Sequence, residues 1–190
     1  MSERPALEEG RNPGGHLLFV GRFRRSQRAV GDGVSGEGGV LVQFFEIRGM
    51  AGGPGADPHA KWVIGFVGET PVSDELSRLV EGKNVLGRDL QVRKFQAADN
   101  PRACNILFIS ESEKKRLPGI LAALRGSNVL TVADMDGFLN SGGMVAFVVE
   151  DSRVKVAIDV AATGRAKLKV SSKLLALAHV VSGPDRGASN

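Results

Sequence analysis

The sequence predicts an α/β fold: a single domain with a mostly parallel sheet, an antiparallel hairpin at one side, and helices on both faces. Residues 105–109 and 129–132 are short, nearly continuous apolar runs, as strands that are buried on both faces require. A helical pattern over 111–124 connects them. A connection of this length allows the second strand to run parallel to the first.

The second observation is a hairpin pattern further along the chain. Residues 144–150 and 153–159 are both rich in β-branched residues, and only Asp151 and Ser152 separate them. A two-residue loop of polar residues between two such runs is typical of an antiparallel β-hairpin. This pair of strands supplies the antiparallel part of the predicted sheet.

The other elements follow in chain order from residue 61. Residues 62–67 are an apolar strand that ends at Gly68, and Pro71 opens a helix over 71–80. Residues 84–87 are expected to form a loop, and 90–95 alternate as a strand does. After the hairpin we expect a short helix over 161–167.

Two helices carry clear end signals. Ser110 and Glu113 have the spacing of a capping box at the start of the helix over 111–124, and Gly126 ends that helix. Ser171 or Ser172 caps a last helix, which is expected to continue to residue 181. Residues 182–190 form a polar tail, expected to be disordered.

Composition and motifs argue against several functions. The net charge is +4, and no Lys/Arg cluster is interleaved with aromatic residues, so no nucleic-acid partner is expected. The three histidines are scattered, and the sequence has no nucleophile elbow and no Walker loop. The sequence therefore predicts a protein without enzymatic activity, metal or cofactor.

Candidate ligand-binding residues follow from the fold class. In open α/β sheets, ligands bind beyond the carboxyl ends of the strands. A glycine pair before a strand can offer backbone amides to an anion, although it more often only turns the chain. These two arguments give a possible ligand crevice formed by Gly68, Ser110, Glu111, Asp134, Gly142 and Gly143.

An ordered set of motifs resembles the YfiR-like family, from about residue 62 to 181. The motifs are residues 103–110, residues 130–134, Gly137-Phe138, residues 142–144 and residues 171–175. The resemblance implies a small periplasmic, non-enzymatic protein that binds the sensor domain of an inner-membrane diguanylate cyclase. Binding would hold the cyclase inactive and lower cyclic-di-GMP signalling, and family members look like homodimers.

Two further expectations accompany this resemblance. An alternative is a periplasmic small-molecule-binding module that serves another membrane receptor. The expected interface lies on the last helix, through Leu174, Leu177 and Val181, with burial of the same residues in the core as the alternative. Proteins of the YfiR type carry paired cysteines, whereas Cys104 is the only cysteine here, so redox control by a disulfide is in doubt.

Residues 1–60 differ from the domain expected over 61–181. Thirteen of the 25 glycines precede residue 57, no lysine precedes Lys61, and no secretory signal is present. If the gene is read one base later, the bases that encode Met50 and Ala51 specify Trp. The neighbouring bases permit Glu before this Trp and Pro after it, and Glu-Trp-Pro ends the first helix of the family. We interpret this low-order segment as an out-of-frame translation of a signal peptide and first helix. The chain as printed would then stay in the cytoplasm.

Overall fold

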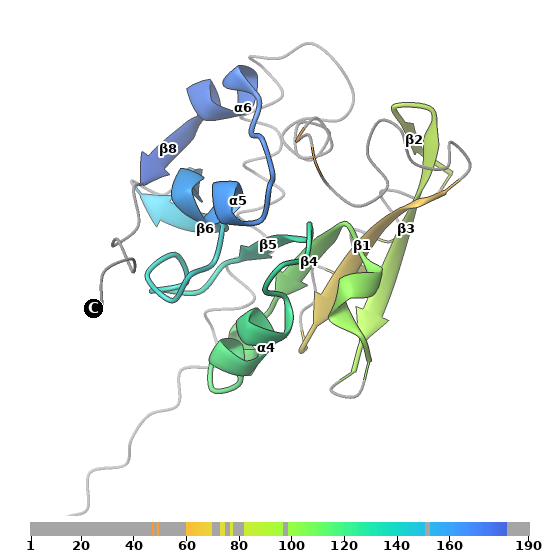
Figure 1. The fold of residues 1–190 in the computed structure, drawn as a ribbon, viewed down its shortest axis with the longest axis horizontal. Coiled ribbons are helices and arrows are strands. Elements are labelled where there is room, and N and C mark those ends of the chain that lie inside the picture. The colour runs from red at the N-terminus through yellow and green to blue at the C-terminus, as the bar shows by residue number, and fades with distance from the viewer. Residues whose placement is uncertain are drawn as a thin grey trace, which may run out of the picture.

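A computed structural model describes residues 47, 49, 60–69, 73, 74, 77, 82–96, 99–150 and 153–181. The described residues form one eight-stranded sheet, shown in Figure 1. Its strands are β1 (Trp62–Val67), β2 (Asn84–Val85), β3 (Arg88–Phe95), β4 (Ile106–Ile109), β5 (Leu130–Ala133), β6 (Val145–Glu150), β7 (Arg153–Asp159) and β8 (Ala178–Val181). The helices are α4 (Leu117–Ala123), α5 (Val160–Arg165) and α6 (Ser172–Leu177), with short 3₁₀ turns η1 (Pro101–Ala103) and η2 (Glu111–Glu113).

The strand order is β2-β3-β1-β4-β5-β6-β7-β8. The parallel strands are, in their order across the sheet, β3, β1, β4, β5 and β6. If these strands are numbered 1 to 5 in chain order, their order across the sheet is 2-1-3-4-5. This is the flavodoxin-like order of doubly wound folds. Strands β6 and β7 are antiparallel, and Glu150 pairs with Arg153, so the predicted two-residue hairpin is confirmed. The predicted fold class is confirmed as well.

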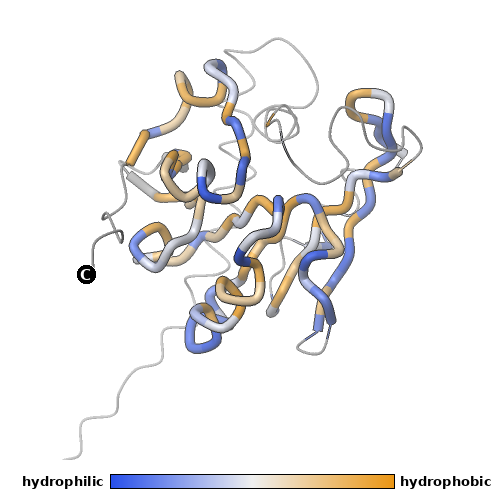
Figure 2. Tube along the Cα trace, viewed as in Figure 1, coloured by the Kyte–Doolittle hydropathy of each residue, from blue (hydrophilic) through white to orange (hydrophobic). Residues whose placement is uncertain are grey.

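The core lies on both faces of the sheet because alternate strand residues point to opposite sides. Figure 2 shows the hydrophobic colouring concentrated along the central strands. On one face Phe66 and Phe108 pack with ring centroids 5.3 Å apart, and Leu174 of α6 joins the same cluster. On the other face Leu117 and Leu124 of the α4 region pack against β1, β4 and β5. Helices therefore cover both faces, as predicted.

The predicted helix over 111–124 is divided in two. Glu111–Glu113 forms a 3₁₀ turn, and α4 begins only at Leu117, with Pro118 in its first turn. A proline lacks the N–H that a helix interior needs and clashes with the carbonyl four residues earlier, so a single helix through Pro118 is disfavoured. The Ser110 side chain caps the turn by accepting from the N–H of Ser112, not from that of Glu113 as the capping-box spacing predicts.

Two other predictions are corrected at the edges of the sheet. The last helix ends at Leu177, and Ala178–Val181 pairs with β7 as strand β8. Valine favours strands, and pairing satisfies the open edge of β7. The loop expected at 84–87 is the tip of the β2–β3 hairpin. Leu86 and Gly87 both have positive φ, 52° and 80°, as a type I′ turn requires.

The structure describes the predicted helix over 71–80 only at Ser73, Asp74 and Ser77, which are helical. Of the N-terminal segment it describes Ile47, Gly49 and Ala60. Ile47 is buried in the core, and the Gly49 carbonyl accepts from the side-chain amide of Asn128 at 2.7 Å. The remainder of this segment and residues 182–190 lie outside the described residues. Within the described ranges, no helix is long and apolar enough to cross a membrane.

Candidate functional site

The carboxyl ends of three parallel strands meet at one edge of the sheet. Val67, Ile109 and Ala133 end β1, β4 and β5 and are in register with one another. The residues that follow them, Gly68, Ser110 and Asp134, therefore stand along the same edge, as predicted. In a sheet of 2-1-3-4-5 order, the ligand crevice lies between the strands that correspond here to β1 and β4.

That crevice is closed by the protein itself. The Ser110 hydroxyl donates to the carbonyl oxygen of Glu69 at 2.6 Å, and the Glu69 N–H donates to Ser112 Oγ at 3.1 Å. Gly68 has a φ of +86°, and a Cβ at that position would lie 2.5 Å from Ser112 Oγ. Through these described residues, the turn after β1 thus rests directly on the turn after β4.

Glu111 lies on the outer side of this junction. It is exposed on η2, and Ser110, which precedes it, is fully buried. At this edge the predicted residues Gly68 and Ser110 are therefore next to one another, and Ser110 is engaged in the contact between the two turns.

The glycine pair lies elsewhere in the fold. The N–H of Met144 donates to Thr131 Oγ1 at 3.2 Å, so Gly142 and Gly143 precede β6 beside the amino end of β5. The connection after β5 returns along the sheet before β6 begins, which separates the pair from Gly68 and Ser110. Gly143 packs on the ring of Phe138, where a Cβ would lie 2.2 Å from a ring carbon. Gly142 lines a cleft at this second edge.

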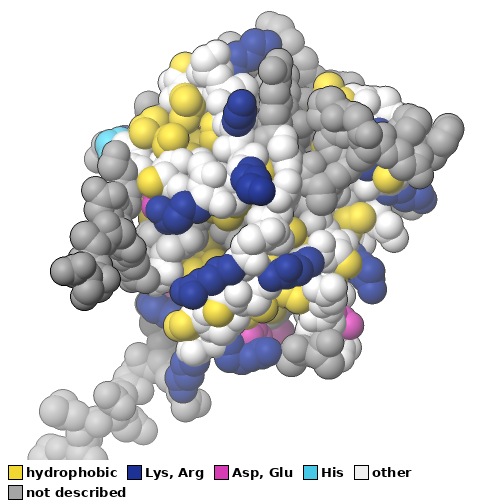
Figure 3. Space-filling model, viewed as in Figure 1, with side chains coloured by type: hydrophobic (Ala, Val, Ile, Leu, Met, Phe, Trp, Pro, Cys, Tyr) yellow, Lys and Arg dark blue, Asp and Glu magenta, His cyan; other side chains and the backbone are white. Residues whose placement is uncertain are grey.

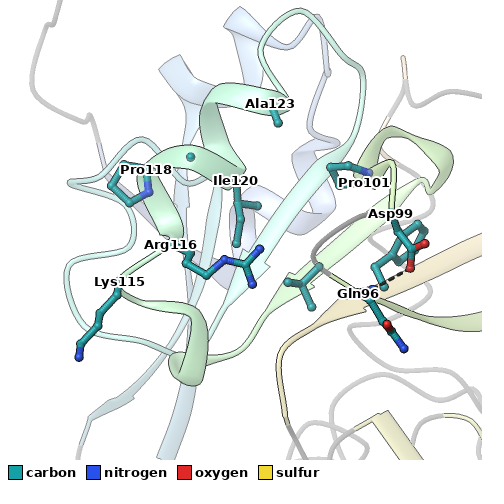
Figure 4. Close-up of a pocket in the computed structure, with 11 residues that line it drawn as sticks. Gln96, Asp99, Pro101, Lys115, Arg116, Pro118, Ile120 and Ala123 are labelled. Atoms are coloured by element: carbon teal, nitrogen blue, oxygen red, sulfur yellow. Dashed lines mark hydrogen bonds between the residues drawn. The ribbon is translucent and has the colours of Figure 1, made fainter.

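A hollow of about 470 Å³ lies between α4 and the connection from β3 to β4, as Figure 4 shows. Arg116 points into the space between these two segments, and Lys115 points away from it. The Arg116 guanidinium pairs with Glu113 at 2.8 Å, and Asp99 Oδ2 accepts from the N–H of Gln96 at 2.7 Å. These charged groups already have partners, so the hollow offers little to a charged ligand. The sequence patterns gave no sign of it.

The expected interface residues divide between core and surface. Leu174 has no exposed surface and belongs to the core cluster. Leu177 at the end of α6 is 49% exposed, and Val181 on β8 is partly exposed. Val180, which sequence reasoning did not single out, is also 49% exposed because β8 is a strand and not a helix. Figure 3 shows hydrophobic side chains gathered over α6 and β8, beside the histidine.

We call Leu177, Val180 and Val181 the α6–β8 edge. Strand β8 is the last strand of the described sheet, so it has a hydrogen-bonded neighbour on one side only. An edge strand with apolar side chains can pair with another chain. This edge therefore combines open backbone groups with exposed apolar area.

Cys104 is buried, with 3% of its surface exposed, and it is a free thiol. Burial raises the pKa of the Cys104 thiol to about 12, and its Sγ donates to the carbonyl oxygen of Pro101 at 3.2 Å. A thiol in this environment stays protonated at neutral pH and is a poor nucleophile. Among the described residues, no three His, Cys, Asp or Glu side chains gather in a way that could hold a metal ion.

Comparison of the chain with curated proteins gives no match. A comparison with family models gives a match to the family described as YfiR/HmsC-like, over residues 51–179. This range covers all strands from β1 to β7 and both α4 and α5, and it includes the residues that close the crevice. Because the match covers more than half of the 190 residues, the chain belongs to the YfiR/HmsC-like family.

Proposed function

We propose that this protein is a periplasmic regulator that binds the sensor domain of an inner-membrane diguanylate cyclase. By holding the cyclase inactive, it would lower cyclic-di-GMP signalling without an enzymatic activity of its own. The observation that carries the proposal is the match to the YfiR/HmsC-like family over residues 51–179.

The closed crevice supports a regulatory role over a catalytic one. Doubly wound folds that act on nucleotides or cofactors hold them at the place where Ser110 and Ser112 here contact Glu69. Among the described residues, these contacts of two serine side chains with the Glu69 backbone lie at the usual cofactor position and tie two loops together. A domain whose loops are joined in this way is suited to presenting a surface to another protein.

The α6–β8 edge is our candidate for that surface. The centres of protein interfaces are apolar and depleted of charge, and Leu177 and Val180 provide exposed apolar side chains without a charged residue between them. The open side of β8 adds backbone donors and acceptors for an extended segment of a partner. The same edge is available for a homodimer, which would compete with the cyclase or extend the binding surface.

The second candidate function is a periplasmic small-molecule-binding module that serves another membrane receptor. The observation that favours it is a cleft of about 610 Å³ beside Gly142 and Thr131. Clefts of roughly 300–1,000 Å³ are the size of small-molecule sites.

Affinity capture from solubilised bacterial membranes tests the proposal and separates the two candidates. Bait proteins would be the parent chain, a Leu177→Asp/Val180→Asp variant and a Leu86→Asp control. Leu86 is 63% exposed at the opposite edge of the sheet, so the control introduces one substitution of the same kind away from β8. Recovery of a diguanylate cyclase by the parent and the control, but not by the double variant, is the expected result. Recovery of a different class of sensor would favour the second candidate, and recovery of neither would contradict both.

A further inference from the structure

The cleft beside Gly142 lies between the end of α4, the connection into β6, and α5. Its volume is about 610 Å³, within the range of about 300–1,000 Å³ that is usual for small-molecule sites. It lies away from the closed crevice, because Met144 borders it beside Thr131 at the amino end of β5. The described residues that line it are Leu121, Leu124, Arg125, Gly126, Ser127, Thr131, Ser141, Gly142, Met144, Ala162, Arg165 and Ala166.

The charge of this lining has one sign. Arg125 and Arg165 both contribute to it, and the described lining residues include no Asp or Glu. Within the described ranges, neither arginine forms a salt bridge with a carboxylate. Figure 3 shows Lys and Arg side chains spread over α4 and α5 on this face of the molecule. A guanidinium presents a planar set of donors that matches a carboxylate or phosphate, so two of them favour an anion.

The serine hydroxyl groups of the cleft are already hydrogen-bonded within the protein, so binding of an anion would depend on the arginines. Ser127 donates to the carbonyl oxygen of Leu124 at 2.6 Å, and Ser141 donates to that of Gly137 at 3.0 Å. Both serine protons are therefore engaged in local turns. Thr131, buried at the floor, accepts from the N–H of Met144. The remaining wall is apolar and is formed by Leu121, Leu124, Met144, Ala162 and Ala166.

The two arginines are carried by fixed segments. Arg102 donates to the carbonyl oxygens of Ala123 and Arg125 at 2.8 Å and 2.7 Å, which holds the turn after α4 in place. Asp159 is buried and caps α5 by accepting from the N–H of Ala162 at 2.9 Å, which fixes the helix that carries Arg165. A site whose supports are held in this way loses less entropy when a ligand binds.

We propose that this cleft binds a small organic anion. Its carboxylate or phosphate group would face Arg125 and Arg165, and its apolar body would lie against Leu121 and Met144. The inference does not depend on the cyclase partner, because it rests on the lining of the cleft and on the support of its walls.

Calorimetric titration of the full chain at 0.15 M salt tests the proposal with four probes. Phenyl phosphate and phenylacetate carry both an anionic head and an apolar body. Inorganic phosphate carries the head alone, and benzyl alcohol carries the body alone. We expect the first two to bind at least about tenfold more tightly than the last two, because a head or a body alone loses one set of contacts.

Variants then locate the binding. Arg125→Glu and Arg165→Glu should each weaken phenyl phosphate binding at least about tenfold, since each reverses one charge that faces the ligand. Leu121→Ala should weaken phenyl phosphate but leave inorganic phosphate unchanged. Lys114→Glu is the matched control, because it makes the same charge change at an exposed residue outside the cleft. The fluorescence emission of Trp62, which is the only tryptophan in the sequence, shows whether each variant is folded.

Several results would overturn the proposal. One is that neither phenyl phosphate nor phenylacetate binds the parent chain. Another is that Lys114→Glu weakens binding as much as the two arginine variants, which would indicate attraction by net charge only. Tighter binding of a hexaglutamate peptide than of phenyl phosphate, lost in the same arginine variants, would assign the cleft to an acidic protein segment instead.

Discussion

The Ser110 hydroxyl donates a hydrogen bond of 2.6 Å to the carbonyl oxygen of Glu69, 41 residues earlier in the chain. This bond joins the turn after β1 to the turn after β4, where sheets of this strand order usually bind a cofactor. The described residues at this position therefore hold two loops together.

Replacing Ser110 with alanine should destabilise the domain by about 1–3 kcal/mol, because the Glu69 carbonyl loses a donor that comes from a fully buried side chain, in a part-buried hydrogen bond. Ser112→Ala should cost less, since Ser112 is exposed and water can replace its contact with the Glu69 N–H. Urea denaturation followed by Trp62 emission measures both variants. Equal losses in the two would show that the hydrogen bond from Ser110 to Glu69 is not what holds the junction.

Gly68→Ala tests how tightly the two turns meet. Gly68 and Gly137 both have positive φ, +86° and +76°, but only Gly68 has neighbours within 4 Å of a new Cβ. Backbone strain alone should cost about 1–2 kcal/mol in Gly137→Ala. Gly68→Ala should cost at least about 1 kcal/mol more because of the clash with Ser112 and Glu113. Matching losses in urea denaturation would mean that the junction opens freely.

The buried thiol should make stability depend on alkaline pH. The pKa of Cys104 is about 12 in the folded protein and near its ordinary value of 9.0 when unfolded. The thiol therefore ionises first in the unfolded state. Its contribution to the free energy of unfolding should be fully present below pH 9 and should fall as the pH rises toward 12, by up to about 1.4 kcal/mol per pH unit. Cys104→Ala should lack this part of the fall, and the absence of tyrosine removes one competing titration. Identical pH profiles for the two proteins would contradict this.

The central strands and the hairpin could be predicted because their signals are local. Residues 105–109 and 129–132 are apolar except for Asn105 and Thr131, and a nearly continuous apolar run is the pattern of a strand that is buried on both faces. The edge of the sheet could not be predicted in this way. Residues 173–181 are apolar at helical spacing, but Val180 and Val181 join β7, because pairing with a distant strand outweighs a local preference.

The candidate site was predicted in part. The order of the parallel strands places Gly68 beside Ser110, and the fold class was enough to predict that. The closure of the crevice depends on the rotamer of the Ser110 side chain and on the approach of two backbones, which no sequence pattern encodes. Gly142 was assigned to the wrong edge because the course of the chain between β5 and β6 has no periodic signal.

We propose that residues from about 1 to 56 are translated out of frame, and two chains test this. The chain as printed has only a short apolar run before several arginines near its start, so it should stay in the cytoplasm. A gene whose first 56 codons are read one base later should yield an exported protein. Fractionation of cells with immunodetection measures both. Export of the printed chain, or a gene sequence without any insertion or deletion, would contradict the frameshift.

The most direct test of the proposed function is the cyclic-di-GMP content of cells that carry the captured cyclase. Each form of the regulator would be directed to the periplasm by an added signal peptide, and cyclic-di-GMP would be measured by mass spectrometry. The parent chain and Leu86→Asp should lower cyclic-di-GMP. Leu177→Asp/Val180→Asp should leave it at the level of cells without the regulator, because the α6–β8 edge no longer offers an apolar surface. An unchanged level with the parent chain would contradict the regulatory function, and an equal reduction by the double variant would contradict the assignment of the binding surface.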